Sequence, residues 1–400
     1  MLVQKYKDML SGKSVIRQLS EFATERGKEI GYENVFDYSL GNPSVPVPEK
    51  FTEVMIRMLR EEPPVALHGY SPSLGIPEVR EKVAASLRKR FGIPYTKDHI
   101  FMASGAAGAL SHAFRLVTQP GDEILTFAPF FPEYHPYVDL TGAVLKVVPA
   151  NTEDFQINFS AFEEMIGEKT MAVLINTPNN PSGIVYSAET LTKLAALLTE
   201  KSREYGHVIY LISDEPYREL VFGGVEAPCV SGFYDHTIVC YSFSKSLSLP
   251  GERIGYVAVN PACEGAEYMV PMCAQISRGI GHNCPASIIQ LAVAEVLELT
   301  SDISVYETNA EILYQKLTEL GFTCVKPGGT FYIFPKALEE DAKVFCQKAL
   351  KYDLVLVPSD SFGCPGYFRM AYCIDTEKVE RSLKALERFV ETEYPDRVRG

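Results

Sequence analysis

The stretch YSFSKSLSLPGERIGY, residues 241–256, places a lysine just after a buried strand. Residues 237–241, TIVCY, have the composition of a core strand, and Lys245 follows them among serines, ahead of a Pro-Gly turn. A lysine at a strand end is usually a solvated surface residue. When it is partly desolvated and lies near other cations, it can lose its proton at neutral pH and attack a carbonyl to form a Schiff base.

The neighbours of Lys245 in the sequence are suited to binding a phosphate. Ser242 and Ser244 offer hydroxyl groups, and Arg253 supplies a fixed positive charge. A nucleophilic lysine beside phosphate-binding side chains is the combination that pyridoxal phosphate requires. The sequence therefore predicts this cofactor at the end of the strand.

The wider sequence predicts two kinds of domain. From about residue 45 to 286, short runs of Val, Ile and Leu alternate with amphipathic stretches, which favours an α/β layer with a mainly parallel sheet. The remainder, 1–44 and 287–400, is expected to form a smaller domain from an N-terminal arm and an α+β part. We expect strands at 123–127, 143–148, 172–175, 208–212, 238–241 and 256–259, and helices at 76–90, 108–118, 188–205 and 287–317.

Composition favours small-molecule chemistry. Four hundred residues exceed one ordinary core, and a hydrophobic fraction of 46% is ample for burial. A net charge of −13 argues against binding nucleic acid or an anionic membrane. The charged N-terminus lacks the apolar core of a secretory signal, and no later run is long enough to span a membrane. We therefore expect a soluble, cytoplasmic protein.

The cysteines predict neither disulfides nor a metal site. Nine cysteines are an odd number, and they are scattered with no Cys-x-x-Cys. His282 and Cys284 lie close together, but no second ligand pair accompanies them. We interpret the cysteines as reduced thiols that mostly fill the core.

A further segment offers what the pyridine ring of the cofactor would need. Its nitrogen must stay protonated to withdraw electrons, which requires a buried carboxylate. Asp214 in ISDEPY follows the strand VIYLI, and Tyr217 comes three residues later, where it can reach the phenolic oxygen of the ring. Asp214 taken alone would be an ordinary helix cap at a strand end.

Two turns allow both a structural and a functional interpretation. NTPNNPSG, residues 176–183, suits a turn, and Asn180 in it can also aim an amide at the phenolic oxygen. In MASGAAGAL, residues 102–110, a short strand leads into a helix. The amides of Gly105, Ala106 and Ala107 at that helix start suit a phosphate, although close helix packing explains the small residues equally well.

Together these segments resemble the fold-type I, pyridoxal phosphate-dependent aminotransferases, in the aspartate aminotransferase branch. The likeness runs in order from SVIRQLSEFA (14–23) to FRMAYC (368–373), and its most specific part is SFSK with GERIG at 242–255. The resemblance implies a large domain with a mainly parallel seven-stranded sheet flanked by helices, plus a smaller α+β domain.

The resemblance also assigns roles by position. Lys245 would form the internal aldimine, while Asp214, Tyr217 and Asn180 would hold the ring. For the phosphate it assigns Ser242, Arg253 and the amides of the segment Gly105, Ala106 and Ala107. Phe131 in APFFPEY takes the place of a stacking ring that is often Trp or Tyr, and since the chain has no Trp, a weaker stack is expected. Tyr70 in HGYSPSLG matches a tyrosine that reaches the phosphate of the neighbouring subunit, which implies a homodimer with shared active sites.

Three residues are implied in substrate binding besides Asn180. Arg369 in FRMAYC matches the arginine that grips the α-carboxylate, unless it is a surface residue at a strand edge. Gly41 in SLGNPS resembles the loop that closes over the substrate. Arg278 stands five residues before Asn283, a spacing similar to that of dicarboxylate-specific members, whose arginine crosses the dimer interface. The block departs from the family pattern at Gly279, His282 and Cys284, and an ordinary interface arginine is the alternative.

The implied activity is transfer of an amino group from an L-amino acid, aspartate being favoured, to 2-oxoglutarate by a ping-pong mechanism. Lys245 would act as general base and then acid. A carbon-sulfur β-lyase or an aminocyclopropane-forming synthase would use the same cofactor, although Arg253 in GERIG is the form typical of aminotransferases. A non-catalytic, effector-binding regulator would need a DNA-reading module, and the acidic charge and the early start of the resemblance argue against one.

Overall fold

The computed structural model describes residues 2–11 and 15–398, so Ser14 of the SVIRQLSEFA block and residues 1, 12, 13, 399 and 400 of the expected smaller domain lie outside the described residues. The chain forms two compact units. The larger consists of Val45–Asn180 and Ile184–Ile303, and the smaller of Met1–Ser44, Pro181–Gly183 and Ser304–Gly400. The domain limits expected from the sequence, with the large domain at 45–286, stay a prediction.

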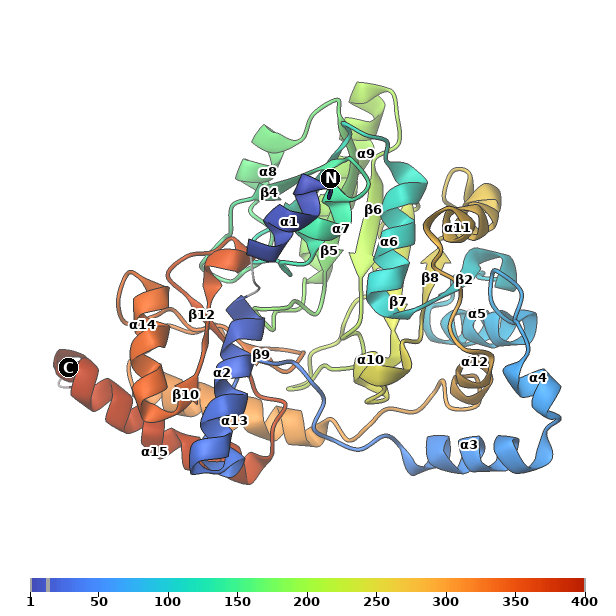
Figure 1. The fold of residues 1–400 in the computed structure, drawn as a ribbon. Coiled ribbons are helices and arrows are strands. Elements are labelled where there is room, and N and C mark those ends of the chain that lie inside the picture. The colour runs from blue at the N-terminus through green and yellow to red at the C-terminus, as the bar shows by residue number, and fades with distance from the viewer. Residues whose placement is uncertain (1, 12–14, 399–400) are drawn as a thin grey trace. The chain divides into compact units, whose positions relative to one another are not determined.

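The larger unit contains the mainly parallel, seven-stranded sheet that the sequence predicted (Figure 1). The strand order is β2-β8-β7-β6-β5-β3-β4, and only β8 runs antiparallel to its neighbours β2 and β7. Each of the six strands expected by range is present to within two residues at either end. The strands are β2 (Ile100–Ala103), β3 (Glu123–Phe127), β4 (Val144–Val148), β5 (Thr170–Asn176), β6 (Tyr210–Asp214), β7 (Thr237–Ser242) and β8 (Gly255–Val259).

Helices cover both faces of this sheet because its buried side chains alternate in direction. In β7, Ile238 and Cys240 pack with α6, α7 and α11, whereas Val239 and Tyr241 pack on the opposite face with α3, α5 and α12. Helices α8 and α9 cover that same opposite face beside β3, β5 and β6. The helices are α3 (Glu49–Glu61), α4 (Pro64–His68), α5 (Pro77–Phe91), α6 (Gly105–Val117), α7 (Tyr134–Asp139), α8 (Phe159–Met165), α9 (Ala188–Tyr205), α10 (Phe243–Ser246), α11 (Ala266–Ile280) and α12 (Ser287–Val293).

One expected helix is wrong. The sequence predicted a continuous helix over 287–317, but α12 ends at Val293 and the next helix begins at Ser304. Thr300, Ser301 and Asp302 lie between them, and short polar side chains of this kind compete with helical hydrogen bonds. The Ser301 N–H instead donates to the carbonyl oxygen of Ser246, 2.7 Å away.

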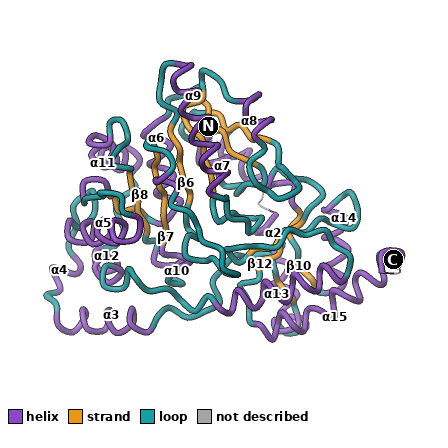
Figure 2. Tube along the Cα trace, turned by 180° about the vertical axis from the view of Figure 1, so that it is seen from behind, coloured by secondary structure: helices purple, strands orange, loops and turns teal. Residues whose placement is uncertain are grey.

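The smaller unit combines long helices with two small sheets. Strand β1 pairs in parallel with β10, and β12 lies between β11 and β9 in an antiparallel sheet. Helices α13 and α15 run side by side (Figure 2). The elements are α1 (Gln4–Ser11), α2 (Val15–Ile30), β1 (Phe36–Asp37), α13 (Ser304–Glu319), β9 (Tyr332–Ile333), α14 (Ala342–Ala349), β10 (Leu354–Val355), β11 (Val357–Pro358), β12 (Phe368–Ala371), α15 (Thr376–Glu393) and α16 (Pro395–Val398).

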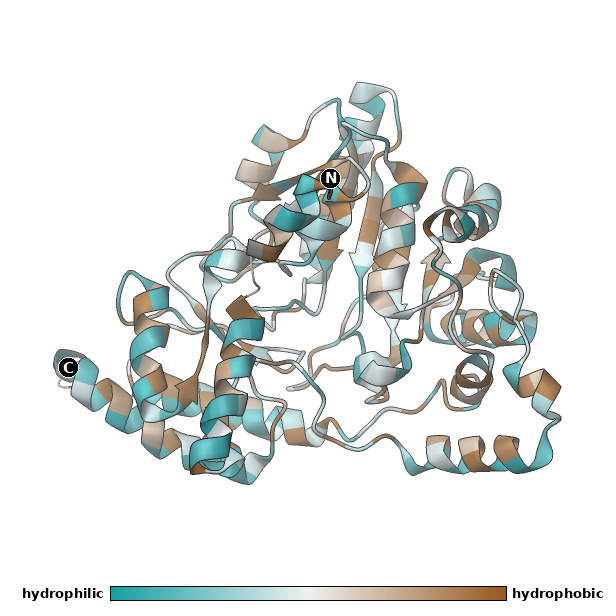
Figure 3. Ribbon diagram, viewed as in Figure 1, coloured by the Kyte–Doolittle hydropathy of each residue, from teal (hydrophilic) through white to brown (hydrophobic). Residues whose placement is uncertain are grey.

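The distribution of apolar residues follows these layers. Figure 3 shows brown and teal patches alternating along α3, whose residues Phe51, Val54 and Met58 are buried.

None of the helices in the described part of the chain combines the length and hydrophobicity that a membrane span requires. All nine cysteines lie within the described residues and are free thiols. Among those residues, no group of three or more His, Cys, Asp or Glu side chains could hold a metal ion.

Candidate active site

Lys245 lies one turn beyond the end of a central strand. Strand β7 ends at Ser242, and the short helix α10 follows at once. The Ser242 hydroxyl caps this helix, since its oxygen accepts the Ser244 N–H at 3.1 Å, and it donates to the Ser244 hydroxyl at 2.7 Å. Lys245 itself is half-buried, so the alternative of a fully solvated lysine does not apply.

Asp214 is a buried carboxylate at the end of the neighbouring strand β6. Its Oδ2 accepts a hydrogen bond from the Tyr134 hydroxyl at 2.6 Å. Its Oδ1 is buried and has no hydrogen-bond partner among the residues that the structure describes. Burial, with the charge of Glu215 adding to it, raises the pKa of Asp214 to about 7, although the Tyr134 hydrogen bond opposes the rise. No helix starts at Asp214, so it is not the helix cap of the alternative interpretation.

Asn176 fixes the backbone of both Asp214 and Asn180. Asn176 ends strand β5 in register with Asp214, and its Nδ2 donates to the Asp214 carbonyl oxygen at 2.8 Å. The Asn176 Oδ1 accepts the backbone N–H of Asn180 at 2.7 Å. Asn180 and Tyr217 are both buried close to these strand ends. The carboxyl ends of β5, β6 and β7 meet at one edge of the sheet, where ligands of open α/β sheets bind.

The residues predicted to bind phosphate gather at the start of α6. Arg253 Nη2 donates to the carbonyl oxygen of Ser104 at 3.4 Å, and a Cβ added to Gly105 would lie 2.7 Å from that same nitrogen. Ala106 and Ala107 follow in the first turn of the helix, whose N–H groups have no intrahelical acceptor. Arg253 has φ +52°, a strained conformation for a residue other than glycine that is often kept at functional sites.

Other predicted residues lie further out. Phe131 is half-buried with its ring edge-on to Tyr134 at 5.7 Å. Tyr70 is fully exposed. Arg278 is exposed in the last turn of α11, where its Nη1 donates to Gln275 Oε1 at 3.1 Å.

Arg369 and Gly41 belong to the smaller unit, so their approach to Lys245 stays a prediction. Arg369 in β12 is 2% exposed, which rules out the alternative of a surface arginine. Its Nη2 donates to the Ser39 carbonyl oxygen at 2.6 Å, and its guanidinium lies 4.5 Å from the centre of the Tyr332 ring. A Cβ on Gly41 would lie 1.8 Å from the Tyr332 hydroxyl, so this position requires glycine.

Reasoning from the sequence missed Tyr134 and Asn176. Asn176 could have been found as a polar residue at a strand end, since it opens the NTPNNPSG turn. Tyr134 lies in the APFFPEY block, but nothing local indicates that it contacts Asp214, which is 80 positions later in the chain.

The donor set fits pyridoxal phosphate. Asp214 presents one buried carboxylate oxygen without a partner in the described part of the chain, which matches the single N–H of a protonated pyridine. The Arg253 guanidinium and the start of α6 supply the positive charge and N–H groups that a phosphate needs.

Comparison with known proteins identifies relatives over most of the chain. The family model for aminotransferase class I and II matches residues 33–386. An aspartate aminotransferase from Thermotoga maritima is 31% identical over 90% of this chain and 92% of its own length. A probable aspartate/prephenate aminotransferase from Aquifex aeolicus is 30% identical over 92% of this chain and 94% of its own. The crystal structure of an amino transferase from Eubacterium rectale, 44% identical, superimposes with a TM-score of 0.95 over 98% of this chain and all of that one.

Proposed function

This chain belongs to the class I and II aminotransferases, and within that family we propose that it transfers the amino group of aspartate to 2-oxoglutarate. It is a pyridoxal phosphate-dependent aminotransferase of fold type I. The observation that carries the proposal is the buried Asp214 carboxylate. Its Oδ2 accepts a hydrogen bond from Tyr134, and its Oδ1 has no hydrogen-bond partner in the described part of the chain.

The cofactor would be held by the residues around the carboxyl ends of β5, β6 and β7. Asp214 would keep the ring nitrogen protonated, with Tyr217 and Asn180 beside the ring. Ser242, Arg253 and the first turn of α6 would hold the phosphate, and Phe131 would lie on the ring face. When bound, pyridoxal phosphate supplies an aldehyde that links to amines and a cationic ring that withdraws electrons from the substrate α-carbon.

Lys245 would move the proton on which the reaction depends. Its Nζ would be the amine that holds the cofactor aldehyde, and it would be a free amine while the amino acid is bound. The free amine then accepts the proton from the substrate α-carbon and donates it again, as general base and then acid. Arg369 would bind the α-carboxylate and orient the α-carbon, and the Gly41 loop would exclude water. The first oxoacid leaves before the second binds, which gives a ping-pong order.

Substrate preference would depend on a second cation. Arg278 lies in the last turn of α11 with its side chain exposed and its Nη1 bonded to Gln275, so its other N–H groups can reach a carboxylate outside its own helix. We propose that it binds the distal carboxylate of aspartate in the active site of a partner subunit. The names of two relatives agree with an acidic substrate, since one is named an aspartate aminotransferase and the other a probable aspartate/prephenate aminotransferase.

The exposed Tyr70 supports a homodimer with shared active sites. A fully exposed tyrosine gains nothing from its own fold, whereas in a dimer its hydroxyl could bind a phosphate held by the other subunit. Each active site would then take Lys245 from one subunit and Tyr70 from its partner.

Incubation of the purified enzyme with cofactor, aspartate and 2-oxoglutarate tests the reaction. Formation of glutamate and oxaloacetate is expected. Release of pyruvate and ammonia would instead indicate a β-lyase. Steady-state rates across a panel of donors, including aromatic amino acids, then rank the substrates.

Arg278→Leu tests the acidic pocket, with Arg203→Leu as its matched control. Both arginines are exposed and lie in the last turn of a helix, Arg203 in α9. Loss of Arg278 should lower kcat/KM for aspartate by about 100-fold, as expected when one partner of a desolvated charge pair is removed. Neutral donors should change little. An unchanged preference for aspartate would remove Arg278 from the site.

A further inference from the structure

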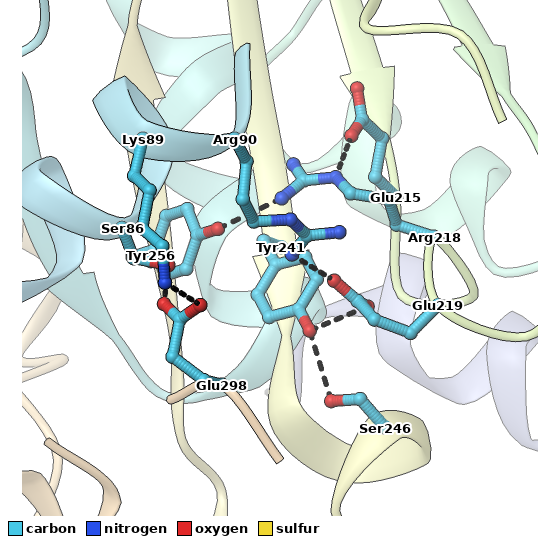
Figure 4. A network of polar contacts seen from close by, with 10 residues as sticks. All are labelled: Ser86, Lys89, Arg90, Glu215, Arg218, Glu219, Tyr241, Ser246, Tyr256 and Glu298. Carbon is cyan, nitrogen blue, oxygen red and sulfur yellow. Dashed lines mark hydrogen bonds and ion pairs between the residues drawn. The ribbon is translucent and has the colours of Figure 1, made fainter. Parts of the chain in front are cut away.

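A network of polar contacts surrounds Tyr241, Arg218 and Glu215 (Figure 4). The strand register places Tyr241 on the face of the sheet opposite the predicted cofactor residues. Asp214 is in register with Cys240, and Cys240 and Ser242 share a face of β7, so these three side chains point the same way. Tyr241, between them in sequence, points to the opposite face and packs in a different core. The network around Tyr241 therefore lies behind the predicted site, on the other face of the sheet, and contributes no side chain to it.

The network is built on a buried ion pair. Arg218 Nε and Glu215 Oε2 are 2.6 Å apart, with side chains only 7% and 5% exposed. Arg218 Nη1 also donates to the Tyr256 hydroxyl at 3.1 Å, and its guanidinium lies 4.7 Å from the centre of the Tyr241 ring. The rings of Tyr241 and Tyr256 stack at 4.8 Å. A buried charge needs such partners to offset its desolvation, so these residues form one closely packed group.

The Tyr241 hydroxyl joins two segments that flank predicted cofactor residues. Its oxygen lies 2.7 Å from Glu219 Oε2 and 2.9 Å from Ser246 Oγ. A phenol has one hydrogen, which goes to the carboxylate, so the Ser246 hydroxyl donates to the phenol oxygen. Glu219 ends the turn that carries Tyr217 and is fixed by Arg90 Nη1 at 2.8 Å. Ser246 is the residue after Lys245 in α10.

Helix α10 depends on such contacts for its position. It has four residues, and a helix of one turn has almost no stability of its own. Ser242 fixes its start through Ser244, and the Tyr241 hydroxyl fixes its last residue. Lys245 therefore lies between two anchored serines.

We propose that Tyr241, by bridging Glu219 and Ser246, is a positioning residue that fixes the helix of Lys245 against the turn of Tyr217. The inference rests on the proposed function, since it concerns the lysine that moves the proton. Tyr241 does not touch substrate or cofactor in this account. It acts by holding Lys245 Nζ in the orientation that proton transfer requires, where small displacements are costly.

Tyr241→Phe in the cofactor-loaded enzyme tests the bridge. It keeps the stack on Tyr256 and the contact with Arg218 but removes the hydroxyl. We expect kcat to fall about tenfold, the factor that corresponds to one lost hydrogen bond, while KM for the amino donor changes little. Hydrogen exchange of the backbone amides at 243–247 should quicken by a similar factor of about ten.

Tyr256→Phe is the matched control. It removes a hydroxyl of the same stack that bonds Arg218, whereas the contact of the Tyr256 ring with Phe243 in α10 is kept. Its kcat and its exchange at 243–247 should stay close to those of the unmodified enzyme. If Tyr241→Phe behaves like Tyr256→Phe in both measurements, the proposal is wrong.

Ser246→Ala cuts the same bridge from the other end and covers the case in which Tyr241→Phe fails to fold. It should reproduce the tenfold loss, and the double variant should be no worse than Tyr241→Phe alone, since Tyr241→Phe already removes the hydrogen bond to Ser246. Additive losses would overturn the proposal. Failure of the unmodified enzyme to transfer amino groups would contradict the proposed function instead, while the exchange measurement would still test the bridge.

Discussion

At the scale of single residues, the buried Asp214 carboxylate is central to the proposed chemistry. A carboxylate buried beside Glu215 is costly to ionise, which is why its pKa rises to about 7 despite the hydrogen bond from Tyr134. A cation placed at Oδ1 would lower that pKa, since an opposite charge favours the ionised form. A protonated pyridine at Oδ1, as proposed, would therefore stabilise the ionised carboxylate.

The pH dependence of stability follows from this pKa. In the cofactor-free protein the native state keeps the Asp214 proton up to about pH 7, whereas the unfolded chain loses it near 3.8. The native state therefore binds the extra proton in this window, and the free energy of unfolding falls as pH rises through it. Between about pH 5 and about pH 6.5 the loss due to Asp214 should be about 2 kcal/mol.

Urea unfolding of the cofactor-free protein and of Asp214→Asn at these two pH values measures the effect. Asparagine does not titrate, so the variant should lose about 2 kcal/mol less than the unmodified protein over the same interval. Parallel losses in the two proteins would show that Asp214 is already ionised at pH 5.

Replacement of Lys245 separates its predicted role in proton transfer from binding of the cofactor. Lys245→Ala should lower amino transfer by about 10³-fold or more, because the general base is gone. The cofactor should still bind, since Asp214, Ser242 and Arg253 remain, and its absorbance after gel filtration measures this. Lys245→Arg keeps the charge but cannot give up a proton, so it should be equally inactive. Normal turnover in either variant would refute the assignment.

At the scale of elements, the site depends on a close approach between the start of β8 and the start of α6. A Cβ on Gly255 would lie 2.2 Å from the Tyr241 carbonyl oxygen and 3.1 Å from the backbone of Gly105. Gly105 has φ +72°, a conformation that favours glycine. These two glycines bring Arg253 to the first turn of α6, where the phosphate is predicted.

Gly255→Ala should therefore destabilise the protein by about 2 to 3 kcal/mol, because rigid backbone on both sides cannot move away. Gly251→Ala is the control, since a Cβ there meets no atom of the described residues within 4 Å and its φ is not positive. It should change stability by no more than about 0.5 kcal/mol. Thermal unfolding of the two variants compares them, and equal shifts would contradict the close approach.

The elements also show where prediction from sequence succeeds. Helix α9 runs from Ala188 to Tyr205 as expected, because Ser187 caps its start and Gly206 ends it, and both signals are local. The prediction of one continuous helix over 287–317 failed because the backbone N–H of Ser301 donates to the carbonyl oxygen of Ser246, which is a tertiary contact. Helix α11 carries Pro271 in its interior, a local signal that argues against a helix, and was not predicted.

At the scale of the whole molecule, several exposed apolar side chains bear on the proposed homodimer. Ile56, Leu59, Val65 and Tyr70 are all exposed within fifteen residues, although they are large and apolar or aromatic. Surfaces of this kind commonly mark protein interfaces. They support the proposed homodimer, in which Tyr70 completes the site of the partner.

Complementation between two impaired variants tests the shared site. Tyr70→Ala and Lys245→Ala should each be strongly impaired as homodimers. In a mixed dimer, one site combines the intact Lys245 of one chain with the intact Tyr70 of the other. Random reassociation should therefore restore about a quarter of the unmodified activity. If mixing does not raise the activity, Tyr70 acts in the active site of its own subunit or in no active site.

The sequence by itself determined the sheet and the family, and it singled out Lys245 as the predicted catalytic residue. Strand alternation, helix caps and the SFSK…GERIG block are short-range patterns, and each is complete within one element or turn. Only the tertiary structure decided which side chains surround these residues. Tyr134 reaches Asp214 across 80 positions because α7 packs on the face of the sheet to which Asp214 points. Tyr241 meets Glu219 across 22 positions because β7 is the neighbour of β6, the strand that leads into the turn of Glu219. Such pairings depend on strand order and on which face each residue occupies, and no local pattern encodes the two together.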